Sequence, residues 1–164
     1  MCNYIRISKK TLIVVVSLIL IFFIKPINGD NMENSSHAIN ASLSLNLLME
    51  GQEHFFAGEY NESIEIYNQA IKLDPNSSLA WIGRGDALLS VGRYNESLEN
   101  YDQAIELDPK SSIAWINRGN ALLSVGRYHE SLESYDQAIK LDPKSSLART
   151  VRSLAEEASR GAWK

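Results

Sequence analysis

The stretch GRYNESLENYDQAIELDPKSS runs from Gly92 to Ser112, and 34 residues later the chain has GRYHESLESYDQAIKLDPKSS. A looser copy, GEYNESIEIYNQAIKLDPNSS, begins at Gly58. The period defines three units, residues 44–77, 78–111 and 112–145, of which the second and third differ at only six of 34 positions. Repeats of this length indicate a solenoid, in which each unit buries its apolar face against the next.

Each unit has the pattern of two helices joined by a tight turn. In the second unit, Trp81 and Leu88 lie on one stripe of a helix that starts after Ser77, a good N-cap residue, and ends before Gly92. A second helix ends at Asp108, because the residue before a proline is disfavoured in a helix. Its apolar stripe is formed by Tyr94, Leu98, Tyr101, Ala104, Ile105 and Leu107.

These residues resemble the tetratricopeptide repeat, whose pattern places Trp, Leu, Gly, Tyr, Ala, Phe, Ala and Pro at positions 4, 7, 8, 11, 20, 24, 27 and 32. The third unit supplies Trp115, Arg118, Gly119, Leu122, Ser131, Tyr135, Ala138 and Pro143. The resemblance implies an all-α fold, a right-handed superhelical solenoid of three helix-turn-helix repeats followed by a capping helix.

The resemblance also implies a concave groove that binds a peptide or helix of a partner protein. The groove residues that we favour are Leu48, Gln52, Phe55, Phe56, Ile82, Asp86, Leu89, Ile116, Asn120 and Leu123. The remaining family groove positions are occupied by Leu45, Leu79, Ile113, Ser90 and Ser124. The groove lacks the basic residues with which some family members hold a C-terminal carboxylate, so we expect a hydrophobic segment as the ligand. Alternatively, several of these aliphatic residues pack only against the adjoining repeat.

Position 7 departs from the family pattern, because Arg84 and Arg118 stand where leucine is usual. A partly buried guanidinium needs a partner. We predict Arg84–Asp102 and Arg118–Asp136 pairs within each repeat; the alternative is an arginine whose charged end reaches solvent.

Residues 146–164 continue the helical pattern as the start of a fourth unit. Leu147, Val151, Leu154 and Ala158 are predicted to form its apolar stripe, with a polar outer face that caps the array.

Residues 1–29 have the features of an export signal. Basic residues precede an uncharged run, residues 11–24, that is shorter than the roughly 20 apolar residues of a membrane-spanning helix. This favours a cleaved signal peptide, with a retained membrane anchor as the alternative. Either would place the rest of the chain outside the cytoplasm, secreted or membrane-anchored. Residues 30–43 are polar and are expected to be a flexible spacer.

Composition argues against nucleic acid as a partner and against catalysis. From residue 30 onward the chain has 12 basic and 20 acidic side chains, a net charge of −8, whereas phosphate binding needs a positive surface. No nucleophile–base pair, metal-ligand spacing or phosphate-binding loop is present, so we expect no enzyme activity, cofactor or metal. We therefore predict a protein-interaction adaptor, with a self-assembling structural element as the alternative.

Overall fold

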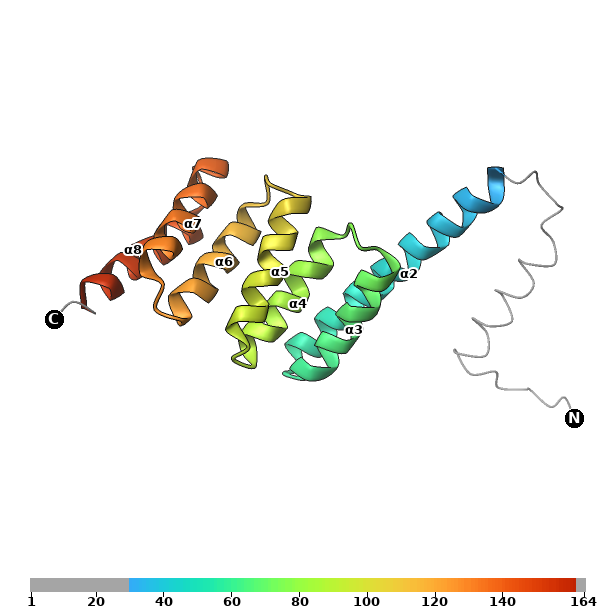
Figure 1. Ribbon diagram of the computed structural model, residues 1–164, viewed down its shortest axis with the longest axis horizontal. Coiled ribbons are helices and arrows are strands. Elements are labelled where there is room, and N and C mark those ends of the chain that lie inside the picture. Colours follow the sequence, from blue (N-terminus) through green and yellow to red (C-terminus); the bar gives the residue numbers. More distant parts are fainter. Residues whose placement is uncertain (1–29, 162–164) are drawn as a thin grey trace, which may run out of the picture. The chain divides into compact units, whose positions relative to one another are not determined.

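The computed structural model describes residues 30–161, and all regular structure in this part of the chain is α-helical (Figure 1). The chain divides into two units after Ile39, and the repeats lie in the second, residues 40–164. The predicted all-α repeat solenoid is confirmed. Its helices are α2 (Asp30–Phe56), α3 (Tyr60–Leu73), α4 (Ser78–Ser90), α5 (Tyr94–Leu107), α6 (Ser112–Ser124), α7 (Tyr128–Leu141) and α8 (Ser146–Gly161).

The helix ends follow from local sequence signals. The Ser77 hydroxyl accepts a hydrogen bond from the backbone N–H of Ala80 at 3.4 Å, which satisfies a free donor at the start of α4. After α4 the chain reverses at Gly92, whose φ of +78° is readily adopted only by glycine. After α5, the Asp108 side chain accepts a hydrogen bond from the N–H of Lys110 at 3.1 Å, which fixes the turn around Pro109.

The two helices of a repeat approach closely because a glycine faces a tyrosine. A Cβ atom on Gly85 would lie 2.6 Å from Cε1 of Tyr101, and one on Gly119 would lie 2.5 Å from Cε1 of Tyr135. Both tyrosines are completely buried. The small residue is therefore what allows a large aromatic ring to fill the space between the helices.

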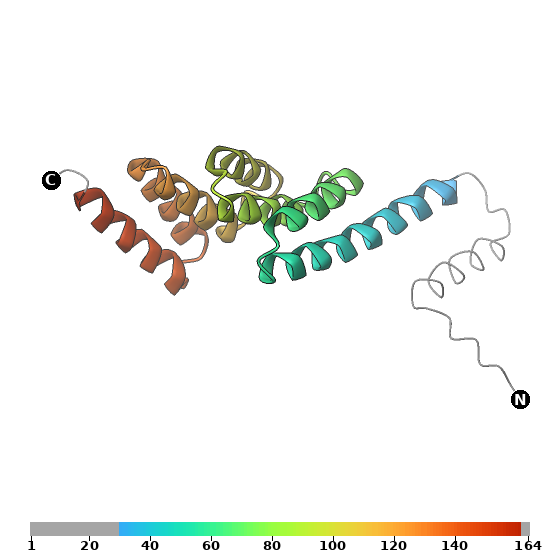
Figure 2. The same cartoon turned by 90° about the horizontal axis from the view of Figure 1, so that it is seen from below.

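The array curves with the first helix of each repeat on the inner side. Helix α4 contacts α6, and α6 contacts α8, whereas no contact joins α3 to α5 or α5 to α7 in the described part of the chain. The first helices are thus closer to each other than the second helices are. Figure 2 shows the helices of this unit from below.

Helix α8 covers the last repeat, as predicted, but with a different face. The buried residues of α8 are Ala148 and Ala155, which pack with Val151 against Ile116 and Tyr135. The prediction that Leu147 and Leu154 lie on the packed stripe is wrong, because they are 53% and 57% exposed; Ala158 is exposed as well. The small side chains of these alanines let α8 approach α7 closely, so the packed face of α8 needs no large residues.

The predicted flexible spacer is also corrected. Residues 30–43 belong to helix α2. The sequence contains no Gly or Pro between Asp30 and Glu50, so nothing interrupts a helix whose C-terminal half is packed, and each added residue contributes another backbone hydrogen bond. The residues from 39 to 43 are exposed, and packing begins at the buried Ser44.

The predicted signal or anchor, residues 1–29 with its apolar run at 11–24, lies outside the described residues. Within residues 30–161, none of the helices combines the length and the apolar character needed to cross a membrane.

Candidate functional site

Exposed aliphatic side chains recur on the inner helices with the period of the repeat. At position 2, counting Ser44 as position 1 of the first unit, Leu45, Leu79 and Ile113 are 58%, 63% and 48% exposed. Leu147 continues the series on α8. Because residues 34 apart occupy the same place on successive repeats, these side chains form a row along the inner face. We call this face the groove.

The other predicted groove residues divide between the groove surface and the core. Ile82 and Ile116 are only 7% and 3% exposed and belong to the core between repeats. Four more, partly buried, pack against core clusters: Leu48, Phe55, Leu89 and Leu123. Gln52 and Phe56 are exposed, and Asp86 and Asn120 are partly buried. The alternative interpretation, packing against the adjoining repeat, therefore describes most of the predicted aliphatic residues.

Asp86 is the centre of a hydrogen-bonded cluster in the groove. Its Oδ1 accepts a hydrogen bond from the hydroxyl of Tyr101 at 2.6 Å and another from Nδ2 of Asn117 at 2.8 Å. In the next repeat, the hydroxyl of Tyr135 donates to Oδ1 of Asn120 at 2.7 Å. The two repeats thus share one geometry, but only Asp86 brings a charge to it.

Burial controls the ionisation of this cluster. It raises the pKa of Asp86 from 3.8 to about 6, against the opposing effect of the hydrogen bonds from Tyr101 and Asn117. Burial, with the nearby Asp86 charge, also raises the pKa of Tyr67 to about 12. The same two causes raise the pKa of Tyr101 more strongly. At neutral pH the cluster therefore consists of a carboxylate and neutral tyrosines.

A pocket of about 390 Å³ opens beside Asp86, between α2 and α4. Gln52, Tyr67 and Asp86 supply its polar groups, and no Lys or Arg lines it. The aliphatic wall is formed by Leu45, Leu48, Met49, Leu79 and Ile82. Such a mixture of apolar walls and a few polar groups is typical of binding pockets.

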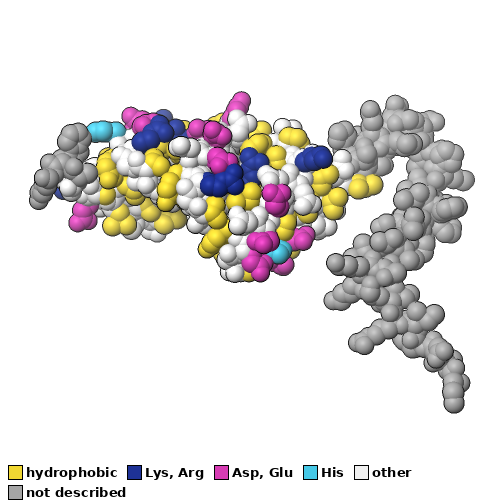
Figure 3. All heavy atoms as spheres, turned by 60° about the horizontal axis from the view of Figure 1, so that its bottom comes forward, with side chains coloured by type: hydrophobic (Ala, Val, Ile, Leu, Met, Phe, Trp, Pro, Cys, Tyr) yellow, Lys and Arg dark blue, Asp and Glu magenta, His cyan; other side chains and the backbone are white. Residues whose placement is uncertain are grey.

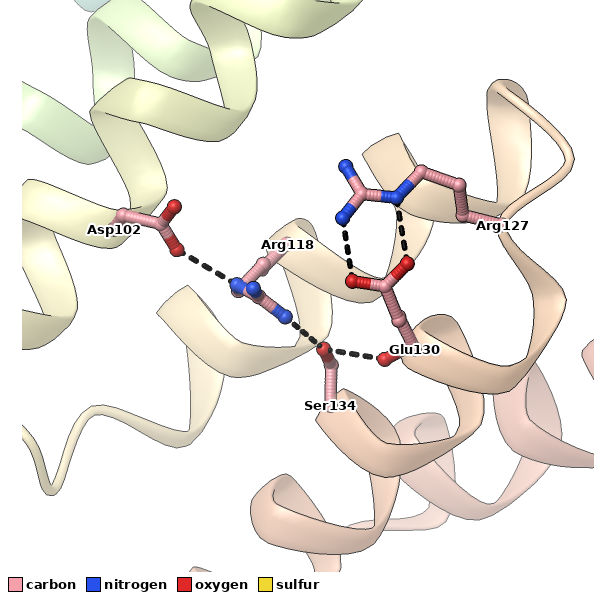
Figure 4. Close-up of polar contacts among 5 residues, drawn as sticks. All are labelled: Asp102, Arg118, Arg127, Glu130 and Ser134. Atoms are coloured by element: carbon pink, nitrogen blue, oxygen red, sulfur yellow. Dashed lines mark hydrogen bonds and ion pairs between the residues drawn. The ribbon is translucent and has the colours of Figure 1, made fainter.

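The position-7 arginines lie at the contacts between repeats. Their partners differ from the predicted pairs within each repeat, which are therefore wrong. Nε of Arg118 donates to Asp102 of the preceding repeat at 2.7 Å, and one of its terminal nitrogens donates to Ser134 at 2.8 Å (Figure 4). Arg152 bonds Asp136 in the same way. The predicted partner position was right, but the partner belongs to the preceding repeat.

Arg84 has amides where the other two arginines have a carboxylate. It donates to Asn68 of the preceding repeat at 2.8 Å and to Asn100 at 2.7 Å, so the predicted Arg84–Asp102 pair is wrong. Its guanidinium also lies 4.7 Å from the ring centre of Trp81. These arginines bind adjacent repeats together rather than face the groove.

Charged side chains of both signs are mixed on the surface. On the face shown in Figure 3, basic side chains lie among acidic ones instead of forming a continuous basic surface. Figure 4 shows one such contact, in which Arg127 faces Glu130 with two hydrogen bonds. Among the described residues, no cluster of His, Cys, Asp and Glu has the arrangement of a metal site.

The comparisons with known proteins agree with this geometry. A family model described as tetratricopeptide repeat matches residues 48–112, 84–146 and 116–162. No curated protein matches the sequence. The TPR domain of Sgt2 from Aspergillus fumigatus is 28% identical, with a TM-score of 0.68, over 73% of this chain and 83% of that domain.

Two further similar structures are complexes with a peptide or protein partner. The second TPR domain of human RPAP3, in complex with the HSP70 peptide SGPTIEEVD, is 28% identical with a TM-score of 0.67, over 73% of this chain and 98% of that one. The TPR2B domain of yeast Sti1, in its pHsp70 complex, is 27% identical with a TM-score of 0.67, over 75% and 98%.

The curved array of helix pairs with an exposed inner face is that of a protein-interaction scaffold. The chain belongs to the tetratricopeptide repeat family.

Proposed function

We propose that this protein is a non-catalytic adaptor whose groove holds a hydrophobic peptide or helix of a partner protein, outside the cytoplasm. The observation that carries the proposal is the row of exposed aliphatic side chains, Leu45, Leu79, Ile113 and Leu147, on the inner helices. An apolar surface repeated along one face of a soluble array is typical of a binding surface.

The chemistry of the groove favours a ligand different from those of the similar structures. The HSP70 peptide bound to human RPAP3 ends in the acidic sequence EEVD. The charged group that lines the pocket in this groove is Asp86, and no basic residue is among the residues that line this pocket. An acidic tail would place like charges together, so an apolar segment is the better fit.

The proposed location depends on residues 1–29, where basic residues precede the apolar run at 11–24. Protease treatment of intact cells that express the full-length chain tests it. Digestion of the repeats without cell lysis, or their recovery from the medium, is expected. Protection of the repeats until lysis would reject an extracytoplasmic adaptor.

Binding is tested by isothermal titration of the full-length chain with apolar and acidic 12-residue peptides. We expect the apolar peptides to bind and the acidic ones not to bind. Replacing Leu79 and Ile113 by serine should weaken binding, whereas serine at Leu107, an exposed leucine of α5 outside the groove, is the matched control. Equal losses in both variants would contradict a groove ligand.

End-to-end assembly is less compatible with the described C-terminal helix. In the third repeat, Trp115 and Leu123 pack against the core cluster that contains Tyr135 and the α8 residues Ala148 and Ala155. The equivalent residues of α8 are Arg149 and Glu157, both exposed, so the surface that would receive another repeat is polar. Light scattering should therefore show no growth of particle mass with concentration.

A further inference from the structure

Position 6 of the repeat lines the pocket between α2 and α4, and it differs between the second and third repeats. Position 6 is Gly83 in the second repeat and Asn117 in the third. The Asn117 side chain reaches back to Asp86, whereas Gly83 carries no side chain and lies against the ring of Tyr67. The pocket therefore forms beside Asp86 on the side that faces the first repeat.

The carboxylate in this pocket is without a countercharge in the described part of the chain. Asp86 forms no ion pair there, and both of its donors, Tyr101 and Asn117, are neutral and bond the same oxygen, Oδ1. A partly buried carboxylate is costly unless a cation pairs with it. At the contacts between repeats, by contrast, a carboxylate does have a cationic partner, because Asp102 forms an ion pair with Arg118.

The walls of the pocket suit the stem of a long basic side chain. Leu45, Leu48, Met49 and Leu79 line the route to Asp86. Lysine and arginine bury their methylene groups along apolar surface while the charged end reaches a polar partner. A purely aliphatic side chain would pack against the same walls but would leave the Asp86 carboxylate without a cation.

We propose that this pocket binds a lysine or arginine side chain within the partner's apolar segment, with its charge on Asp86 and its stem against the aliphatic wall. The inference rests on the proposed function of the groove and specifies what the groove selects. At the equivalent point of the third repeat, Asn120 is neutral, so a single basic residue of the ligand would fix its register along the groove.

The test is a set of 12-residue peptides that share apolar positions and differ at one central position, which is lysine, arginine, norleucine or glutamate. Norleucine matches the lysine stem without the charge. Affinities for the full-length chain are measured by fluorescence anisotropy for the natural sequence and for Asp86→Asn. The variant keeps an oxygen that accepts from Tyr101 and Asn117, as Asn120 does for Tyr135. Glu62→Gln, which removes an exposed acid from α3, is the matched charge control.

We expect the natural protein to bind the lysine and arginine peptides about tenfold more tightly than the norleucine peptide, the scale of one charge-assisted hydrogen bond. Asp86→Asn should abolish that preference and Glu62→Gln should keep it. Circular dichroism confirms that each variant is folded. Equal binding of norleucine, or a preference that survives Asp86→Asn, would overturn the inference while leaving the groove function intact. Failure of every peptide to bind would reject both.

Discussion

Replacing Asp86 by asparagine should stabilise the fold, and only at neutral and alkaline pH. The substitution removes a charge that the fold partly buries, while Tyr101 and Asn117 keep an oxygen to which they donate. The third repeat has this arrangement already, with Asn120 bonded to Tyr135. The variant therefore introduces a geometry that the chain itself uses.

The size of the effect follows from the raised pKa. A carboxyl group whose pKa is 3.8 when unfolded and about 6 when folded disfavours the folded state by about 3 kcal/mol once it is ionised in both states. Well below pH 3.8 the group is protonated in both states and the penalty disappears. Between these limits the folded state binds more protons than the unfolded state, so the natural protein loses stability as the pH rises. Tyr67 and Tyr101 remain neutral throughout.

The assay is urea unfolding of the full-length chain, followed by far-ultraviolet circular dichroism at pH 4 and pH 8. The free energy of unfolding of Asp86→Asn should exceed that of the natural protein by up to about 3 kcal/mol at pH 8. The difference should shrink to less than about 1 kcal/mol at pH 4. Glu62→Gln should show no comparable change with pH. A variant that is no more stable than the natural protein at pH 8, or equally stabilised at both pH values, would refute the reasoning.

Three further predictions concern the packing of the repeats and the groove. Asn68→Asp should give Arg84 the carboxylate that Arg118 has in Asp102, and urea unfolding should show a gain of up to about 1 kcal/mol that high salt removes. Gly85→Ala should lower the free energy of unfolding by about 1–3 kcal/mol, although alanine favours helices, because the new Cβ would lie 2.6 Å from the Tyr101 ring; the same change at Gly161, where nothing lies within 4 Å, should not destabilise. Leu79→Ser should leave the urea midpoint nearly unchanged, because the side chain is 63% exposed, while it weakens peptide binding in titration calorimetry.

Part of the candidate site could be predicted from the sequence by analogy alone. The groove positions follow from the repeat, and Leu45, Leu79 and Ile113 do lie exposed on the inner face. Which of the other aliphatic residues remain available depends on how closely the inner helices approach. Ile82 and Ile116 are buried by the neighbouring repeat, whereas Leu79 and Ile113 are exposed. All four residues are aliphatic, so the sequence alone does not indicate which of them are buried.

The role of Asp86 could not be found by inspecting its own repeat. Its partner Asn117 lies 31 residues away in the next unit, and the pocket beside it depends on the absence of a side chain at Gly83. A comparison of the two nearly identical repeats offers the one available signal, because positions 6 and 9 are among the six that differ.

The sequence by itself determined the number of repeats, the helical class and most helix ends, because these depend on local signals: a serine cap, a glycine with positive φ and a proline. The tertiary structure alone decided which repeat supplies each partner. Asp102 precedes Arg118 by 16 residues, and Asp136 follows it by 18. Both aspartates occupy the same repeat position, so the sequence alone does not indicate which of them pairs with Arg118. The packing angle between successive repeats brings Asp102 within hydrogen-bond distance, and that angle is a property of the whole interface rather than of any local stretch.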